Sequence, residues 1–208
     1  MRFFLLMAAV SLLSCGQNSS PAAKEKADTT TSKIKPDTAT TAPTVKTEPV
    51  YYKTPGEDAV NQMLSAKFGT SWHVVNDREA KWMKEAFDYF IVPKRKDYPD
   101  YPYITKGDFN GDGKSDVAAV VTDSTKNHYQ VAILLGPDNI KFWDEDILVN
   151  AALSTMPKAE TITQGDIETG KVKKIKMKID GINVEYFEQA SFVVYLDRST
   201  FKRIQTGD

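Results

Sequence analysis

The hydrophobic and polar positions of the chain divide it into three zones. Residues 1–14 are almost wholly apolar, residues 15–50 contain almost no large apolar side chain, and residues 51–208 mix apolar and polar positions throughout. A zone without large apolar side chains cannot bury enough surface to offset the entropy lost on ordering. The pattern therefore predicts a single folded domain, residues 51–208, which a disordered tether joins to an apolar N-terminal segment.

Two segments at the start of this domain have helical periodicity. Apolar residues recur at a spacing of three or four between Val60 and Phe68, after a start at residues 54–57 that is typical of a capped helix. A second capped start at Asn76 precedes another apolar stripe. We expect both helices to bury these stripes against a sheet. The second stripe consists of Met83, Ala86, Phe87 and Phe90.

Beyond Tyr103 the apolar period shortens toward two, and short polar links separate the apolar runs. Such links suit antiparallel neighbours. The predicted fold class is α+β, with N-terminal helices packed on an antiparallel β-sheet meander. The predicted strands span residues 116–122, 129–135, 140–143, 172–179, 191–196 and 201–205.

Residues 172–179 alternate apolar side chains with lysines. Because successive side chains of a strand point to opposite faces, the lysines line one face of that strand. A sheet face that is open to solvent explains this pattern. The alternative is a lysine face that binds an anionic glycan or a lipid headgroup.

The N-terminal zone has the features of an export signal. Arg2 supplies one positive charge before the apolar run of residues 3–13, which is shorter than the roughly 20 residues that span a bilayer. The run ends in Leu12-Leu13-Ser14-Cys15, which resembles the bacterial lipobox. That resemblance implies cleavage behind Ser14 and lipidation of Cys15, the one cysteine of the chain. An ordinary secretory signal with an incidental cysteine is the alternative.

Location and charge narrow the classes of partner. Gly16 stands where lipoproteins retained in the inner membrane often have Asp, which implies anchoring in the outer membrane of the cell envelope. A tether of residues 15–50 would reach about 30 Å from the anchor. The net charge of the chain is −1, which gives no field to attract nucleic acid. We therefore expect the membrane as a partner, through the lipid, and no nucleic acid.

Residues 107–116 carry the clearest chemical pattern, Gly-Asp-Phe-Asn-Gly-Asp-Gly-Lys-Ser-Asp, before an apolar strand. Calcium binds six to eight oxygen atoms, and alternate positions of a tight loop can direct their oxygens to one point. The side chains at loop positions one, three, five and nine supply such oxygens, and the lysine at position seven offers its carbonyl. The predicted Ca²⁺ ligands in the loop of residues 108–116 are Asp108, Asn110, Asp112, Lys114 and Asp116.

The first half of this loop matches an EF-hand, but position twelve is Ala119 rather than the bidentate Glu that an EF-hand uses. The loop instead resembles the calcium loop of FG-GAP, or VCBS, repeats, which occur in integrin alpha chains and in many bacterial surface proteins. The resemblance covers residues 107–121 and implies that Asp116 closes the site. It does not extend to the propeller fold, because the chain has one copy of the motif. A glycine-rich turn stabilised by its own Asp and Asn side chains, without metal, is the alternative.

Three tyrosines precede this loop on a proline-rich segment and form the candidate partner-binding residues. Tyrosine supplies flat contact area at low entropic cost, so Tyr98, Tyr101 and Tyr103 would suit an envelope protein or a glycan. The alternative is that these rings cover the edge of the sheet.

Signals for catalysis are few. The chain has two histidines, His73 and His128, and lacks zinc-ligand spacing, a nucleophile elbow and a phosphate-binding glycine loop. We expect a non-enzymatic, calcium-stabilised lipoprotein of the cell envelope that acts as an interaction module. The alternatives are an envelope hydrolase that uses acidic residues such as Glu185 and Glu188, or an enzyme-inhibitor lipoprotein.

Overall fold

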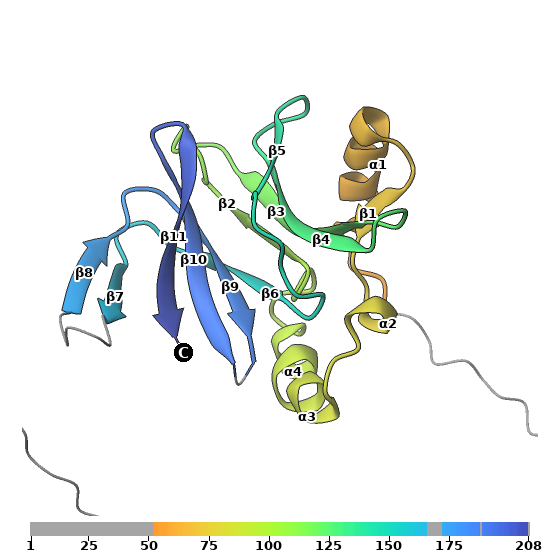
Figure 1. Ribbon diagram of the computed structural model, residues 1–208, viewed down its shortest axis with the longest axis horizontal. Helices are drawn as coiled ribbons and strands as arrows, with labels where there is room; N and C mark the ends of the chain where they lie inside the picture. The colour runs from red at the N-terminus through yellow and green to blue at the C-terminus, as the bar shows by residue number, and fades with distance from the viewer. Residues whose placement is uncertain (1–51, 166–171, 188, 208) are drawn as a thin grey trace, which may run out of the picture. The chain divides into compact units, whose positions relative to one another are not determined.

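Two antiparallel sheets and a separate hairpin form most of the structure, a computed structural model that describes residues 52–165, 172–187 and 189–207 (Figure 1). Helices are short and come mainly before the first long strand. They are α1 (Glu57–Phe68), α2 (Asp77–Ala80), α3 (Lys84–Ala86), the π-helix η1 (Phe87–Ile91) and α4 (Val92–Lys94).

The first sheet is built around β3, in which every residue except Val117 is buried. β4 pairs with one edge of β3, and β1 and β2 lie end to end along its other edge, beside residues 121–123 and 116–119 respectively. The strands of this sheet are β1 (Trp72–Val74), β2 (Ile104–Gly107), β3 (Asp116–Asp123), β4 (His128–Leu134) and β5 (Ile140–Phe142).

Between β1 and β2 the chain makes an excursion, residues 76–102, that begins and ends at the same place on the sheet. The backbone N–H of Val75 donates to the carbonyl of Val120 at 2.9 Å, and the N–H of Val120 donates to the carbonyl of Tyr103 at 2.8 Å. A single residue of β3 therefore fixes both ends of the excursion, which contains α2, α3, η1 and α4.

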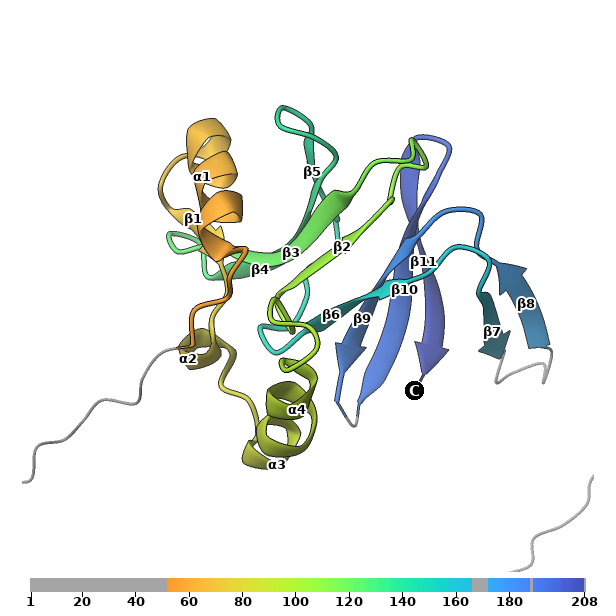
Figure 2. The ribbon, with the colours of Figure 1, turned by 180° about the vertical axis from the view of Figure 1, so that it is seen from behind.

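The second sheet has the order β11-β10-β9-β6, and the β7–β8 hairpin is inserted in sequence between β6 and β9. Figure 2 shows the hairpin beyond β10 and β11, on the side away from β3 and α1. The strands of this part are β6 (Ala152–Met156), β7 (Thr161–Gly165), β8 (Val172–Lys176), β9 (Gly181–Tyr186), β10 (Ala190–Asp197) and β11 (Thr200–Gly207).

One hydrophobic core joins the two sheets. Val120 and Ile133 of the first sheet and Leu153 and Val184 of the second are almost fully buried in the same cluster. Full burial of such a side chain stabilises the fold by about 1.5–3 kcal/mol. Helix α1 adds Leu64 to this core, so its apolar stripe has the predicted role.

The predicted fold class, helices packed on a single antiparallel meander, is wrong. The described chain is 41% strand and 18% helix, and its helical part is too small to form a layer. The predicted second helix is interrupted at Lys81, which adopts a left-handed conformation with φ 50° and ends α2 after one turn. The structure also has strands that the prediction omits, namely β1, β2, β6, β7 and β9.

The apolar stripe assigned to this second helix is only partly in the core. Ala86 is buried, but Met83 and Phe90 are 48% and 49% exposed. The π-helical turn of η1 shifts the side chains relative to α-helical spacing, so the three-and-four pattern does not describe one buried face. None of the helices within the described ranges is long and apolar enough to span a bilayer.

Candidate functional site

The predicted calcium loop connects β2 to β3 and lies against the turn that precedes β9. Gly111 and Gly113 have φ values of 79° and 82°, a left-handed conformation that glycine adopts without strain. A Cβ atom on Gly111 would lie 2.7 Å from Cγ2 of Ile179, so the loop backbone packs directly on that turn. Glycine is therefore required at this point for both conformation and space.

The two ends of the loop hold its centre through aspartate side chains. Oδ2 of Asp108 accepts a hydrogen bond of 3.0 Å from the N–H of Gly113. Oδ2 of Asp116, which is buried, accepts from the N–H groups of Phe109 and Asn110 at 2.9 and 3.2 Å. These bonds draw the first and last predicted ligands toward the same short stretch of backbone.

The middle of the loop forms two successive turns stabilised by side chains. Oδ1 of Asn110 accepts from the N–H of Asp112, and Oδ1 of Asp112 accepts from the N–H of Lys114, both at 2.8 Å. The Lys114 N–H lowers the pKa of Asp112 from its ordinary value, and the Asn110 amide lowers it further. Lys114 is itself exposed, as expected for a residue whose predicted ligand is its carbonyl.

The charges of the loop favour a cation. The pKa of Asp116 is raised from its ordinary value. Burial is the largest cause, the Phe109 and Asn110 N–H groups oppose it, and the nearby carboxylates of Asp112 and Asp108 add to it. Oδ1 of Asp108 is buried and has no hydrogen-bond partner. A hard cation beside this oxygen would relieve both the repulsion and the missing bond.

Within the described ranges, no three His, Cys, Asp or Glu side chains converge closely enough to hold a metal ion. In the loop, Asp112 and Asp116 are hydrogen-bonded to backbone N–H groups instead, and one predicted ligand is an amide. The donor set suits calcium in chemistry and in charge. Calcium binding stays a prediction for Asp108, Asn110, Asp112, Lys114 and Asp116.

Asp180, which was not among the predicted site residues, fastens this loop to the second sheet. Its Oδ2 accepts from the N–H of Asp108 at 2.9 Å, and its Oδ1 accepts from the N–H of Lys158 at 2.8 Å. The sequence signal is the Asp180-Gly181 pair, a turn signature directly before β9. Its contact with the loop, however, depends on how the two sheets pack.

A cavity of about 580 Å³ lies next to this junction. Ile104 and Leu153 form part of its wall and are buried, whereas Tyr98 is 64% exposed. The cavity is also lined by Lys106 and Pro157. Lys106 is two residues before Asp108 of the predicted calcium loop, and Pro157 directly precedes Lys158. We call this the tyrosine cavity; its lining residues are Lys94, Asp97, Tyr98, Pro99, Asp100, Tyr101, Ile104, Thr105, Lys106, Leu153, Ser154, Thr155 and Pro157.

The three candidate tyrosines have different environments. Tyr98 and Tyr101 line the tyrosine cavity, although Tyr101 is otherwise buried. Tyr103 is 1% exposed, and its hydroxyl donates to Asp77 at 2.8 Å while accepting from Trp82 Nε1 at 2.7 Å. The expectation of three tyrosines on one binding face is therefore wrong for Tyr103, which belongs to the core.

A buried ion pair fixes the segment that carries these tyrosines. The guanidinium of Arg95 donates to both carboxylate oxygens of Asp77, at 2.9 and 2.6 Å, and its Nε donates to the carbonyl of Tyr101 at 2.8 Å. The ring of Tyr52 covers the same guanidinium at 4.1 Å. Through these contacts Arg95 connects the backbone of Tyr101, in the wall of the cavity, to the first residue of α2.

A second cavity, of about 700 Å³, meets the tyrosine cavity at Lys94 and Tyr101, which line both. Phe90 and Phe187 stack beside it with ring centres 5.0 Å apart. Glu185 also lines this cavity, and it accepts a hydrogen bond of 2.7 Å from Asn183. Its suggested acidic partner, Glu188, lies outside the described residues.

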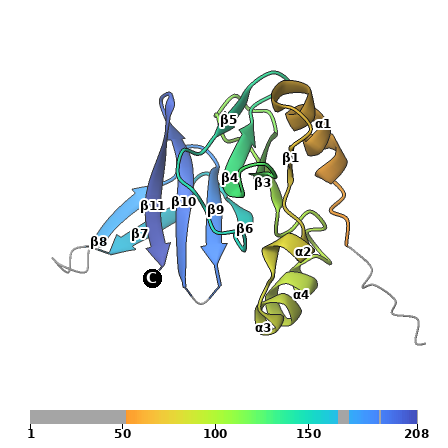
Figure 3. The same ribbon diagram turned by 45° about the vertical axis from the view of Figure 1, so that its right-hand side comes forward.

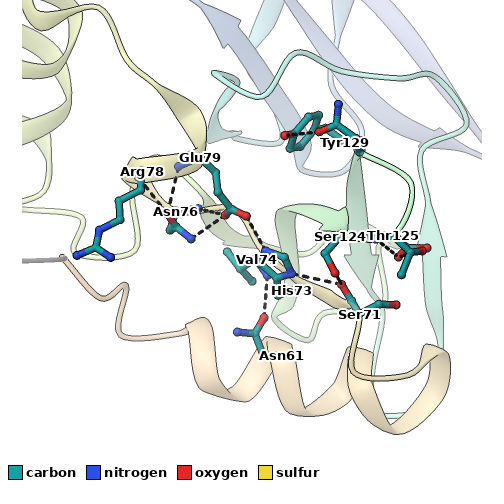
Figure 4. A network of polar contacts seen from close by, with 12 residues as sticks. Asn61, Ser71, His73, Val74, Asn76, Arg78, Glu79, Ser124, Thr125 and Tyr129 are labelled. Atoms are coloured by element: carbon teal, nitrogen blue, oxygen red, sulfur yellow. Dashed lines mark hydrogen bonds and ion pairs between the residues drawn. The ribbon is translucent and has the colours of Figure 1, made fainter.

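The two histidines contact carboxylates near element ends and line neither of these cavities. Nε2 of His73 lies 2.7 Å from Oε1 of Glu79, whose other oxygen accepts from the N–H of Asn76 in the capping box of α2 (Figure 4). Nδ1 of His128 lies 3.0 Å from Asp146. These contacts fix local structure.

The predicted signal peptide, Cys15 and the tether lie outside the described residues. Comparisons of the chain with protein-family models, curated proteins and solved structures find no match.

Proposed function

We propose that this chain is a non-enzymatic lipoprotein of the cell envelope, anchored through Cys15, whose calcium-stabilised domain binds an envelope protein or glycan in the tyrosine cavity. The observation that carries the proposal is the position of Asp180. One of its oxygens holds Asp108 of the calcium loop, and the other holds Lys158, next to Pro157 of the cavity wall. A metal that orders the loop would therefore also order the cavity.

Two further contacts connect the same parts. The hydroxyl of Thr155 donates to the carbonyl of Lys106 at 2.7 Å, and Thr105 and Thr155 share a hydrogen bond of 2.7 Å. These bonds join β2, which leads into the loop, to β6 in the wall of the cavity. The cavity itself combines buried apolar residues with an exposed tyrosine and charged residues at its edge, a composition that suits a specific ligand.

The metal part is tested by thermal unfolding of residues 15–208, which retain every residue of the hydrophobic clusters. With an expected dissociation constant on the order of 10⁻⁴ to 10⁻³ M, about 10 mM calcium should raise the melting temperature by about 3 to 10 °C. Magnesium should raise it less, and Asp112→Ala should abolish the rise. An unchanged melting temperature in saturating calcium contradicts the proposal.

The binding part is tested by affinity capture from envelope fractions, in calcium and in chelator. Tyr98→Ala should lose the captured component, and chelator should weaken capture by the unmodified chain. Tyr89→Ala is the matched control, because Tyr89 is an exposed tyrosine outside the tyrosine cavity. Equal capture by the Tyr98 and Tyr89 variants would assign the interaction to another surface.

A further inference from the structure

The β7–β8 hairpin is a separate two-stranded sheet that pairs with neither larger sheet. Its two strands pair only with each other, from Thr161 opposite Lys176 to Gly165 opposite Val172. Its base packs on the second sheet through Ile162 and Met177, which share a small cluster with Val193 and Ile204. In Figure 3, as in the other views, the rest of the hairpin extends away from the first sheet.

Strand alternation gives the hairpin two unlike faces. Ile175, like its cross-strand partner Ile162, packs against the small cluster at the base. The neighbouring positions 174 and 176 therefore point outward, and the lysines there are exposed. Farther from the base, Lys173 is also exposed and Val172 is 62% exposed, which is unusual for a valine.

The second strand of the hairpin is rich in positive charge. Four of the seven residues from Val172 to Lys178 are lysines and none is acidic, whereas the whole chain has a net charge of −1. The side chains of Lys173, Lys174 and Lys176 have no hydrogen bond or ion pair with another residue in the described ranges. Closely spaced lysines repel one another, and an anionic partner opposite them would offset that repulsion.

We propose that this hairpin docks on the surface of a bilayer that contains anionic phospholipids, with Lys174 and Lys176 against the headgroups and Val172 at the apolar boundary. The inference rests on the anchor of the proposed function, because a lipid on Cys15 and a reach of about 30 Å keep the domain close to a membrane. Lysines beside an exposed aliphatic side chain are the combination that binds such an interface. A soluble polyanion offers no apolar region in which Val172 could be buried.

The test is sedimentation of residues 15–208, with Cys15→Ser so that no acyl chain contributes, with vesicles. Binding is expected to vesicles of phosphatidylcholine and phosphatidylglycerol but not to phosphatidylcholine alone, and added salt should weaken it. The double variant Lys174→Ala, Lys176→Ala should lower partitioning by about 30-fold, since each lysine near an anionic surface contributes about 1 kcal/mol, a factor of about five. Val172→Ser should lower it further.

The matched control is Lys81→Ala with Lys96→Ala, which removes the same charge from exposed positions in the excursion. A loss as large as that of the hairpin variant, or equal binding to neutral vesicles, would overturn the proposal. Because the assay uses neither calcium nor a cavity ligand, its failure leaves those tests unaffected. Mass spectrometry of the membrane-extracted protein tests the lipid on Cys15 separately.

Discussion

The backbone N–H of Asp108 donates a 2.9 Å hydrogen bond to the carboxylate of Asp180, 72 residues further along the chain. The same carboxylate accepts from the N–H of Lys158. The predicted calcium loop is thus held by a residue in the turn before β9, a strand of the other sheet, and the position of its first predicted ligand depends on how the two sheets pack.

Asp180→Ala is expected to destabilise the domain by about 1.5–3 kcal/mol, because it removes a charged acceptor from two N–H groups. Calcium affinity should fall as well, since Asp108 loses its fixed position. Denaturant unfolding and calcium titration measure the two effects. Asp144→Ala, at an exposed position, is the control and should change neither. Normal calcium affinity in the Asp180 variant would show that the loop is organised without this contact.

Removal of Asp77 should be more costly than removal of an exposed acidic residue. Asp77→Ala leaves the Arg95 guanidinium buried without its bidentate partner and the Tyr103 hydroxyl without its acceptor. The expected loss of unfolding free energy is about 3–5 kcal/mol. Chemical denaturation provides the measurement, and a loss below about 1 kcal/mol would mean that the network is readily replaced by water.

Asp123 predicts a specific acid sensitivity. The Thr125 hydroxyl donates to it at 2.7 Å, and with other donors from Thr125, Ser71 and Lys126 it lowers the pKa of Asp123 from 3.8 to about 2. A lowered pKa in the folded state contributes stability above pH 3.8, which is lost as the pH falls toward 2. Asp123→Asn should make stability less dependent on pH in that window. An unchanged slope would contradict the assignment.

Neighbouring residues of η1 provide a test of the corrected helix. Ile91 is fully buried with Tyr101 and Ala152, whereas Phe90 is half exposed. Ile91→Ala should therefore cost about 2–5 kcal/mol. Phe90→Ala should cost clearly less in the same denaturation experiment. A larger loss of unfolding free energy for Phe90→Ala than for Ile91→Ala would instead support the α-helical stripe that the sequence pattern predicts.

The elements predicted well from sequence are those whose pattern is local and complete. β3 and β10 each contain a run of five apolar residues, so both are found within one or two residues of their predicted limits. β1 and β2 are short and depend on pairing with β3, which no local pattern reveals. The left-handed Lys81 and the π-helical turn η1 likewise have no periodic signature.

The candidate site shows the same division. The spacing of Asp108, Asn110, Asp112 and Asp116 identifies the loop from sequence alone, because all four lie within nine consecutive residues. Asp180 could not be identified as its support, since only the packing of the two sheets brings it there. Tyr103 was misassigned because a tyrosine in a proline-rich stretch looks the same whether its ring faces solvent or the core.

The return of the excursion to Val120 has an evolutionary consequence. Val75 and Tyr103 form hydrogen bonds with the same residue of β3. The sheet would therefore keep the same pairing if a short connection replaced residues 76–102. Substitutions at the exposed positions of that segment can therefore accumulate while the pairing of the sheet is kept, whereas Asp77, Ile91 and Arg95 are constrained by their contacts. Tyr98 and most of the charged edge of the tyrosine cavity lie in this segment. Substitutions at these exposed positions could thus change the ligand while the sheet and the predicted calcium loop are kept.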